Sequence, residues 1–244
     1  MEQKHRELFE KLGMEFPAVA VRFHFERPEE VEYNERVASF CEFLKEAQAT
    51  NKRFYIAECN DNCGGKAVLG MVPKSPFEAA GLVGVGHQIY RTPAPNARLH
   101  NTYPTLSPGS VNYVEFCPVA QCDFHPDLVI CVADIEQAFI LMRATSYISG
   151  DLWETKTSCV VSCAWTYVYP YLTGKVNYNI TGMHLGMIRR NLYPSGKMII
   201  SIPYQKLDEV LLALEEMPWT PLSLREDEES KRKFAEVQSK WQRW

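Results

Sequence analysis

The sequence has no long hydrophobic run and no excess of basic charge. No apolar stretch reaches the about 18 to 20 residues that a membrane-spanning helix needs. Lys and Arg number 26 against 30 Asp and Glu, for a formal net charge of −4, which argues against nucleic acid or an anionic membrane as partner. The charged start, Met1–Glu7, lacks the apolar core of a secretory signal. These absences predict a cytoplasmic protein with neither kind of partner.

Several short motifs that would specify a reaction are also absent. The sequence contains no Cys-x2-Cys pair, no ferredoxin-type run of cysteines and no cysteine triplet of the radical-enzyme kind. The segment Gly81–Gly86 is rich in glycine, but it matches neither the phosphate-binding loop nor a clean dinucleotide-binding pattern. We interpret it as a turn. Whether the protein is an enzyme, and on what substrate, therefore stays open at this stage.

The cysteines carry the strongest chemical signal that is present. Four of the eight fall in two equally spaced pairs, Cys59-x3-Cys63 and Cys159-x3-Cys163, and the first pair leads into Gly64-Gly65. Thiolates are strong ligands for soft metals, and glycine lets the backbone approach a cluster or cofactor closely. The pairs therefore indicate a metal or cofactor site in two loops.

Other interpretations of the cysteines remain. Thiols and metal ligands are more common than disulfides in a reducing compartment. Free cysteine is also a frequent small core residue, and we expect this for Cys41 and Cys131, which lie in amphipathic or apolar runs. Cys117-x4-Cys122-x2-His125 offers three zinc ligands, but no second close pair supplies the fourth that structural zinc needs.

Hydrophobic periodicity predicts alternating strands and helices. The predicted strands are 17–25, 53–57, 111–116, 128–132, 176–180 and 197–202. The predicted helices are 2–12, 34–49, 134–149, 159–171 and 204–216, and residues 92–110, with four prolines, are expected to be irregular. Because the pattern lacks regular βαβ spacing, it favours an α+β fold with a mixed sheet flanked by helices.

Two helix starts are marked by side chains that can cap backbone N–H groups. Ser75 precedes Pro76, a residue favoured at the first helical position. Asp134 is followed three residues later by Gln137, which completes a capping box. We therefore expect helices to begin at Pro76 and just after Asp134.

The chain divides into a body and a charged end. Residues 1–220 are predicted to form a single α+β domain, and residues 221–244 a charged helix or tail. In that tail Phe234, Val237, Trp241 and Trp244 are spaced to share one helix face. This stripe either docks on the body of its own chain or contacts a partner. A homodimer through this helix is the partner hypothesis that follows, since Trp is enriched in interface anchors.

A weak internal echo suggests two similar halves. Both Cys-x3-Cys pairs are followed by a Leu-Gly-Met tripeptide, at Leu69–Met71 and at Leu185–Met187. Two related α/β halves facing a shared site would explain this repetition, and chance is the alternative.

An ordered set of short motifs resembles a known family. The motifs are Phe16–Val21, Ala38–Ala47, Cys63–Gly65 with Leu69-Gly70, Pro126–Ile130, Glu136–Ala138, and Cys163-Ala164 leading to Thr173-Gly174. In this order they resemble the DUF169 family of archaea and anaerobic bacteria over roughly residues 15–215. The resemblance implies no reaction, because the family's function is undefined. Its anaerobic members favour an oxygen-sensitive cofactor by association alone.

The resemblance also separates the cysteines. Those that match the family pattern are Cys41, Cys63 and Cys163, although many members have Pro where this chain has Gly64. Cysteines less typical of the family are Cys59, Cys122 and Cys159. This difference bears on whether the two Cys-x3-Cys pairs form one site throughout the family.

Four candidate chemistries follow from the residues. Cys59, Cys63, Cys159 and Cys163 could hold an iron–sulfur cluster or another soft metal, and a helix over 159–171 would put the second pair on one face. The other candidates are the zinc site above, a reactive thiol at Cys63, for which no His or Asp is marked as partner by spacing, and an anionic ligand at Arg189-Arg190.

Together these observations predict a protein that binds a metal centre or small cofactor through its cysteine loops, with redox chemistry as one use. Gly64, Gly65 and Gly182 are the predicted cofactor-binding glycines. We expect the Cys59–Gly65 loop and the Cys163 region to meet at one cavity, because ligands gather where loops leave strand ends. The alternative is a non-catalytic small-molecule binding or carrier protein whose cysteines are structural.

Overall fold

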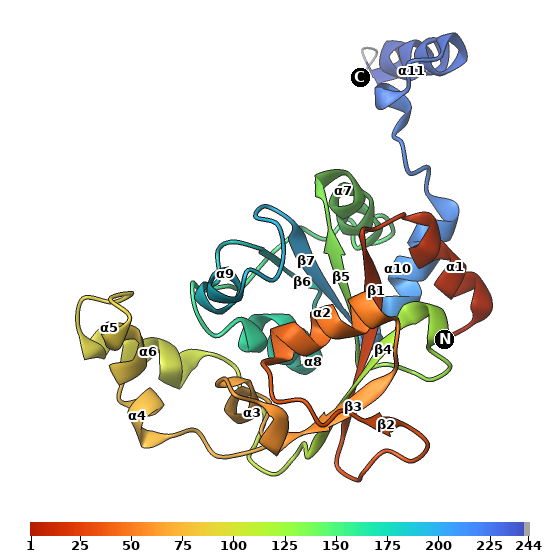
Figure 1. Cartoon of the computed structure of the whole chain (residues 1–244). Helices are drawn as coiled ribbons and strands as arrows, with labels where there is room; N and C mark the ends of the chain where they lie inside the picture. Colours follow the sequence, from red (N-terminus) through yellow and green to blue (C-terminus); the bar gives the residue numbers. More distant parts are fainter. Residues whose placement is uncertain (242–244) are drawn as a thin grey trace.

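A seven-stranded sheet forms the centre of the molecule (Figure 1). The computed structural model describes residues 1–241. The strands are β1 (Phe16–His24), β2 (Glu32–Tyr33), β3 (Phe54–Ala57), β4 (Tyr113–Pro118), β5 (Leu128–Ala133), β6 (Asn177–Ile180) and β7 (Met198–Pro203). Their order across the sheet is β2-β3-β4-β1-β5-β7-β6, with only β2 and β3 parallel among these pairs. This mixed sheet with flanking helices confirms the predicted α+β class.

The sheet is built from two halves with the same topology. Leaving aside the two-residue edge strand β2, which pairs with β3, the first half runs outward from the centre as β1, β4, β3 and the second as β5, β7, β6. Among these three strands of each half, the first in sequence is central, the third lies beside it and the second is farthest from the centre. The two halves meet along the antiparallel pair of β1 and β5, where Ala20 lies opposite Val129.

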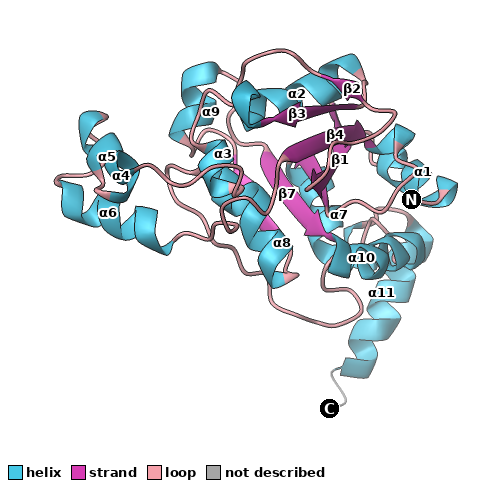
Figure 2. Ribbon diagram, turned by 90° about the horizontal axis from the view of Figure 1, so that it is seen from below, coloured by secondary structure: helices cyan, strands magenta, loops and turns pink. Residues whose placement is uncertain are grey.

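Alternating residues of the central strands point into two separate cores. Val19 and Val21 of β1 face one core, whereas Ala18 and Ala20 face the other. The first core is covered by α2 (Phe40–Thr50), the π-helix η3 (Ala164–Val168), α8 (Tyr169–Thr173) and α9 (Leu185–Arg190). The second is covered by α1 (Gln3–Lys11), α7 (Ile135–Ala144) and α10 (Tyr204–Glu216). Figure 2 shows these two helical layers on either side of the strands.

Helix starts follow the side chains that cap them. Asp134 accepts from the backbone N–H groups of Glu136 and Gln137, and Ser75 accepts from that of Glu78, so both predicted caps are confirmed. A third capping box lies at Ser39, so α2 begins at Phe40 rather than at the predicted residue 34. Val37 is consequently outside the helix and 60% exposed.

A group of short helices leaves the body between β3 and β4. After α3 (Gly65–Val68) the chain forms α4 (Pro76–Ala79), α5 (Leu82–Gly86) and α6 (Pro93–Thr102), which stand apart from the sheet in Figure 1. We call α4–α6 the excursion. The prediction of an irregular segment at 92–110 is wrong for α6, because Pro93 and Pro95 occupy its first turn, where no backbone N–H bond is lost. The prediction of a turn at 81–86 is likewise wrong for α5.

The predicted helix over 159–171 is also only partly correct. Residues 164–168 form a π-helix that continues into α8, and Cys159 lies in a non-helical segment before it. Val161 has φ 60°, a left-handed conformation that ends regular helix geometry on the N-terminal side of Cys163. Cys159 and Cys163 therefore do not share a helix face.

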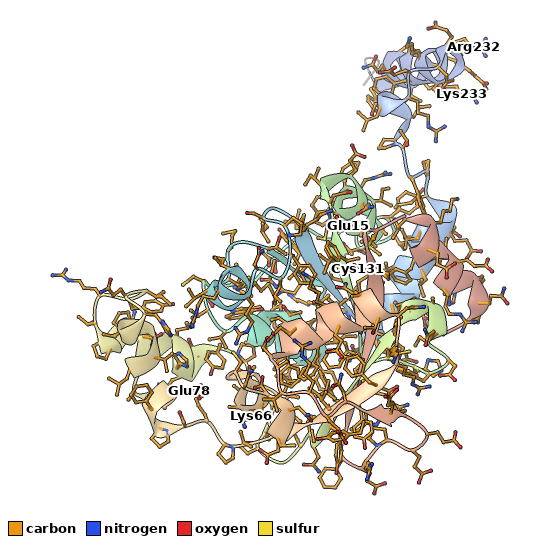
Figure 3. The ribbon with its side chains drawn as sticks, viewed as in Figure 1. Glu15, Lys66, Glu78, Cys131, Arg232 and Lys233 are labelled. Carbon is orange, nitrogen blue, oxygen red and sulfur yellow. The ribbon has the colours of Figure 1, made fainter. Side chains whose placement is uncertain are left out.

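The charged end forms a helix that extends away from the body. α11 (Glu228–Trp241) follows an extended segment, and Figure 1 shows it clear of the sheet and its covering helices. Arg232 and Lys233, labelled in Figure 3, lie on this helix. Docking of the stripe on its own chain is thus not observed, and Trp244 lies outside the described residues. None of the helices within residues 1–241 has the length and apolar character that a membrane crossing requires; the cytoplasmic location stays a prediction.

Candidate functional site

A pocket of about 290 Å³ lies between the excursion and the body. The excursion contributes helices α4, α5 and α6, and the body contributes the loop before α3, the start of α2, the segment before η3, and α9. In Figure 3, Glu78 marks the excursion side and Lys66 the body side. Two hollows of about 390 and 370 Å³ elsewhere are lined by no cysteine. The pocket beside the excursion therefore carries the thiol chemistry.

Three thiols from three segments line this pocket: Cys41, Cys63 and Cys163. Cys41 is the second residue of α2, Cys63 precedes α3, and Cys163 immediately precedes the π-helix. The loop after β3 and the Cys163 region thus meet at one pocket, with Cys41 as a third member. These are also the cysteines that matched the DUF169 pattern.

Cys41 and Cys163 are direct neighbours. A hydrogen bond from the Cys163 thiol lowers the pKa of Cys41 and, at the same time, raises the pKa of Cys163. The Cys41 Sγ also lies 3.8 Å from the hydroxyl of Ser162. Both cysteines are almost fully buried as residues, at 9% and 8% exposure. They form a pair of thiols at the inner wall of the pocket.

Cys63 occupies a different position, at the exposed end of the cluster. The residue is exposed, but loss of water around its sulfur and the nearby Asp61 carboxylate raise the pKa of Cys63. The guanidinium of Arg190 lies within hydrogen-bonding reach of that sulfur and is held by an ion pair with Glu42, 3.1 Å from Arg190 Nε. A cation therefore stands beside the accessible thiol.

Close packing requires the second glycine of the pair, Gly65. A Cβ on Gly65 would lie 2.4 Å from the ring of Phe40 and 3.2 Å from the sulfur of Cys163. A Cβ on Gly64 would lie 3.0 Å from Glu78 Oε1, which belongs to the excursion. Gly65 therefore lets the loop backbone pack against Phe40 and Cys163, whereas Gly64 adjoins only the end of the Glu78 side chain.

Asp61 fixes the loop that carries Cys63. Its carboxylate accepts from the backbone N–H groups of Cys63 at 3.2 Å and Lys66 at 2.8 Å. The side chain is buried, and this burial raises the pKa of Asp61 to about 6. The same carboxylate that orders the loop therefore titrates close to neutral pH.

The other predicted ligands lie outside the pocket wall. Cys59 and Cys159 are both exposed, and each is near a tyrosine hydroxyl, Tyr33 at 3.4 Å and Tyr90 at 3.7 Å. Gly182 occupies a left-handed turn at φ 84°. Of the four cysteines proposed as one metal set, the pocket brings together Cys63 and Cys163.

No ready-made metal cluster is present in the part of the chain that the structure describes. Within residues 1–241, no group of three or more His, Cys, Asp or Glu side chains is placed to hold a metal ion. This includes the candidate zinc ligands. Cys117 and Cys122 are buried neighbours in the second core, and the ring of His125 packs against that of Tyr204 at 5.5 Å.

Two buried polar residues of the pocket were not singled out from the sequence. Asn96 and His184 are both fully buried, and both line the pocket. Asn96 donates from Nδ2 to the carbonyl of Gly81 at 2.7 Å, but its Oδ1 has no partner among the described residues. His184 Nδ1 is likewise unpartnered, and burial lowers the pKa of His184 to about 4. A buried polar atom without a partner is costly, so these two atoms point to a ligand or water in the pocket.

Local backbone distortion surrounds Cys163. Val161 is a β-branched residue at φ 60°, where such side chains are genuine outliers. The π-helix that begins at Ala164 is a rare structure that often occurs at functional sites. Such strain persists only where the surrounding structure over-determines it. Both distortions lie within three residues of one pocket cysteine.

Sequence comparison places the chain in a family. The profile of DUF169, described as uncharacterised ArCR, matches residues 7–212. The chain belongs to the DUF169 family. No curated protein and no solved structure matches it. The resemblance predicted from short motifs over residues 15–215 is thus confirmed, and the pocket described above lies within the part of this DUF169 protein that matches.

Proposed function

We propose that this DUF169 protein binds a small molecule or cofactor in the pocket between the excursion and the body. The observation that carries the proposal is the composition of the wall, where three thiols share one pocket with two unpartnered buried polar atoms. Largely formed pockets with a few convergent polar groups are typical of small-molecule sites. In this proposal the thiols either bind the ligand, as in a carrier protein, or react with it, as in an enzyme.

The wall suggests how a ligand would be held. Asn96 Oδ1 accepts a hydrogen bond, so the ligand should offer an N–H or O–H group on the excursion side. His184 is neutral at pH 7, because burial holds its pKa near 4, and its free Nδ1 accepts or donates according to the tautomer. Val83 and Val161 supply apolar surface between these polar groups. A molecule with a polar edge and an apolar body fits this arrangement.

Pocket access is tested with a small thiol-reactive probe. In the reduced protein, monobromobimane should label Cys41 through the pocket and Cys59 at the surface. Val83→Phe fills the pocket from α5 and should slow labelling of Cys41 at least fivefold, while Cys59 is unaffected. Leu82→Phe is the matched control, since Leu82 is its exposed neighbour outside the pocket wall. Equal labelling of Cys41 in both variants would contradict a pocket that admits ligands. Mass spectrometry of a denatured extract then identifies any bound molecule.

A soft-metal or iron–sulfur centre is the second candidate. It is favoured by thiols from three segments on one pocket, because such thiols are the preferred ligands of soft metals. The thiols would have to rearrange to reach metal-binding geometry, since residues 1–241 hold no preformed group of ligands.

Anaerobic expression distinguishes the two candidates. Protein purified without oxygen is assayed for iron, sulfide and visible absorption. Stoichiometric metal that is lost in Cys41→Ser, Cys63→Ser and Cys163→Ser, but kept in Cys131→Ser, supports the metal centre. Cys131 is the control because it is buried in the other core. Colourless protein without metal, made under the same conditions, leaves the small-molecule site as the function.

A further inference from the structure

Cys41 and Cys163 have the features of a two-electron dithiol. They come from segments far apart in sequence, yet Cys41 Sγ lies 3.8 Å from the hydroxyl of Ser162, the residue before Cys163, and each thiol is close enough to shift the pKa of the other. Because a disulfide bond is about 2 Å long, two sulfurs that already adjoin each other need only a small approach to form one. Both residues line the pocket, which gives a small molecule access to the pair.

The surroundings hold the pair in place. Cys41 lies in the first turn of α2, which is anchored by the capping box of Ser39 and Glu42. Cys163 is packed against the backbone of Gly65, where even a methyl group would come within 3.2 Å of its sulfur. Positioned nucleophiles of this kind need little further ordering to react.

The pair also has an attacking member. The thiolate is the reactive form of cysteine, and the hydrogen bond from Cys163 favours that form at Cys41. Cys163 retains its proton and serves as the second thiol. The strained backbone at Val161 and the π-helix after Cys163 provide a separate sign of specialisation at this point.

We propose that Cys41 and Cys163 reduce a small disulfide bound in the pocket and become a disulfide themselves. The inference rests on the proposed function, because the substrate must enter the pocket. The Cys41 thiolate attacks one sulfur of R–S–S–R, forming a Cys41–S–S–R bond and releasing one RS⁻. The Cys163 sulfur then attacks Cys41 Sγ, which forms the Cys41–Cys163 bond and releases the second R–S⁻. Two electrons pass to the substrate, and the two thiol protons end on the two R–SH products.

Cys63 takes no part in this exchange. It is exposed at the mouth of the pocket, whereas Cys41 and Cys163 are buried together at the inner wall. Cys63 and Arg190 instead line the same side of the pocket, beside each other.

The experiment uses the full chain carrying Cys59→Ser and Cys159→Ser, which removes two exposed thiols. The reduced protein is mixed anaerobically with hydroxyethyl disulfide, quenched with iodoacetamide and digested for mass spectrometry. We expect a Cys41–Cys163 linked peptide and two equivalents of released 2-mercaptoethanol. Cys163→Ser should trap the half-disulfide adduct on Cys41, whereas Cys41→Ser should form neither product. Circular dichroism establishes that each variant is folded, and the alanine variant at the same position replaces any serine variant that is not.

The outcomes separate the inference from the proposed function. Adducts confined to Cys63, with Cys41 and Cys163 still alkylated, would overturn the dithiol while the pocket continues to admit the probe. Val83→Phe should slow the linked peptide at least fivefold relative to Leu82→Phe. If the linked peptide forms at equal rates in these two variants, the pair reacts without the pocket, and the proposal that it reduces a pocket-bound substrate is wrong.

Discussion

At the scale of single residues, the double glycine shows how a chemical clue can have a packing cause. The Cys63–Gly65 sequence predicted backbone freedom around a ligand, and the loop does border the pocket. Gly65, however, has an ordinary backbone conformation; its missing side chain is what Phe40 and Cys163 require. The ligand-binding role of Gly64 and Gly65 stays a prediction, whereas the packing role of Gly65 follows from its contacts.

Gly65→Ala should destabilise the protein. The added methyl group would lie 2.4 Å from the Phe40 ring, which is itself fully buried and cannot move freely. Overpacking of this kind typically costs about 1–3 kcal/mol. Urea unfolding followed by circular dichroism measures the change in the free energy of unfolding. Gly86→Ala is the matched control, because nothing lies within 4 Å of its added carbon. Equal effects at the two glycines would contradict the packing account.

Asp61 should make stability depend on pH. Burial raises its folded-state pKa to about 6, above the value near 4 of a carboxyl in an unfolded chain. The folded state therefore holds the proton more tightly, and stability falls as pH rises through the window from about 4 to about 6. The two pKa values differ by roughly two units, which corresponds to about 3 kcal/mol at most.

Asp61→Asn removes this titration. The variant loses one of two acceptors and should be less stable than the original protein at pH 4. Because Asn cannot ionise, the difference should shrink or reverse by pH 7. Urea unfolding of both proteins at these two pH values provides the test. A difference that stays constant between pH 4 and 7 would show that Asp61 does not titrate in this range.

The sequence distinguished the pocket cysteines better than the pocket's polar residues. Spacing and family resemblance both selected Cys63 and Cys163, because thiols are rare and chemically distinctive. Asn96 and His184 are ordinary polar residues in sequence, and only long-range packing buries them. Equal spacing placed Cys59 and Cys159 in the four-cysteine set. Spacing in the sequence does not determine which side chains of a loop reach the pocket, and these two do not.

At the scale of elements, local signals were reliable where a side chain acts on its own backbone. The caps at Ser75 and Asp134 depend on hydrogen bonds within one turn and were predicted correctly. Helix α10 was predicted with the bounds Tyr204–Glu216 that the structure has. By contrast, the prolines in the first turn of α6 led to the prediction of an irregular segment, although proline is compatible with a helix start. The π-helix at 164–168 was also missed, because hydrophobic periodicity does not distinguish it from an α-helix.

At the scale of the whole molecule, the two matching halves contribute unequally to the pocket. Loop and helix residues of the first half supply Cys41, Cys63 and the excursion, and the second half supplies Cys163 and α9. The sequence echo suggested two similar halves and a shared site, and sheet topology accounts for the first part. The excursion breaks the likeness, because it is inserted only between β3 and β4. The outer wall of the pocket is therefore formed by the excursion, which only one of the two halves contains.

The projecting helix α11 leads to the last prediction, which concerns assembly. Trp241 is 62% exposed, and its ring lies 6.4 Å from that of Phe234 on the same apolar face. An amphipathic helix away from its own body leaves this face without cover. Because a second copy carries the same face, we expect two chains to pair through α11 in a symmetric interface.

Sedimentation velocity tests this pairing on the full chain and on a chain ending at residue 220. The full chain should sediment as a dimer at micromolar concentration and the shortened chain as a monomer. Trp241→Ala should weaken the dimer at least tenfold, as expected for an interface anchor worth about 1.4 kcal/mol or more. Lys240→Ala, at the adjacent exposed position, is the matched control and should not. A shortened chain that remains dimeric would place the interface on the body, and a monomeric full chain would leave α11 for a different partner.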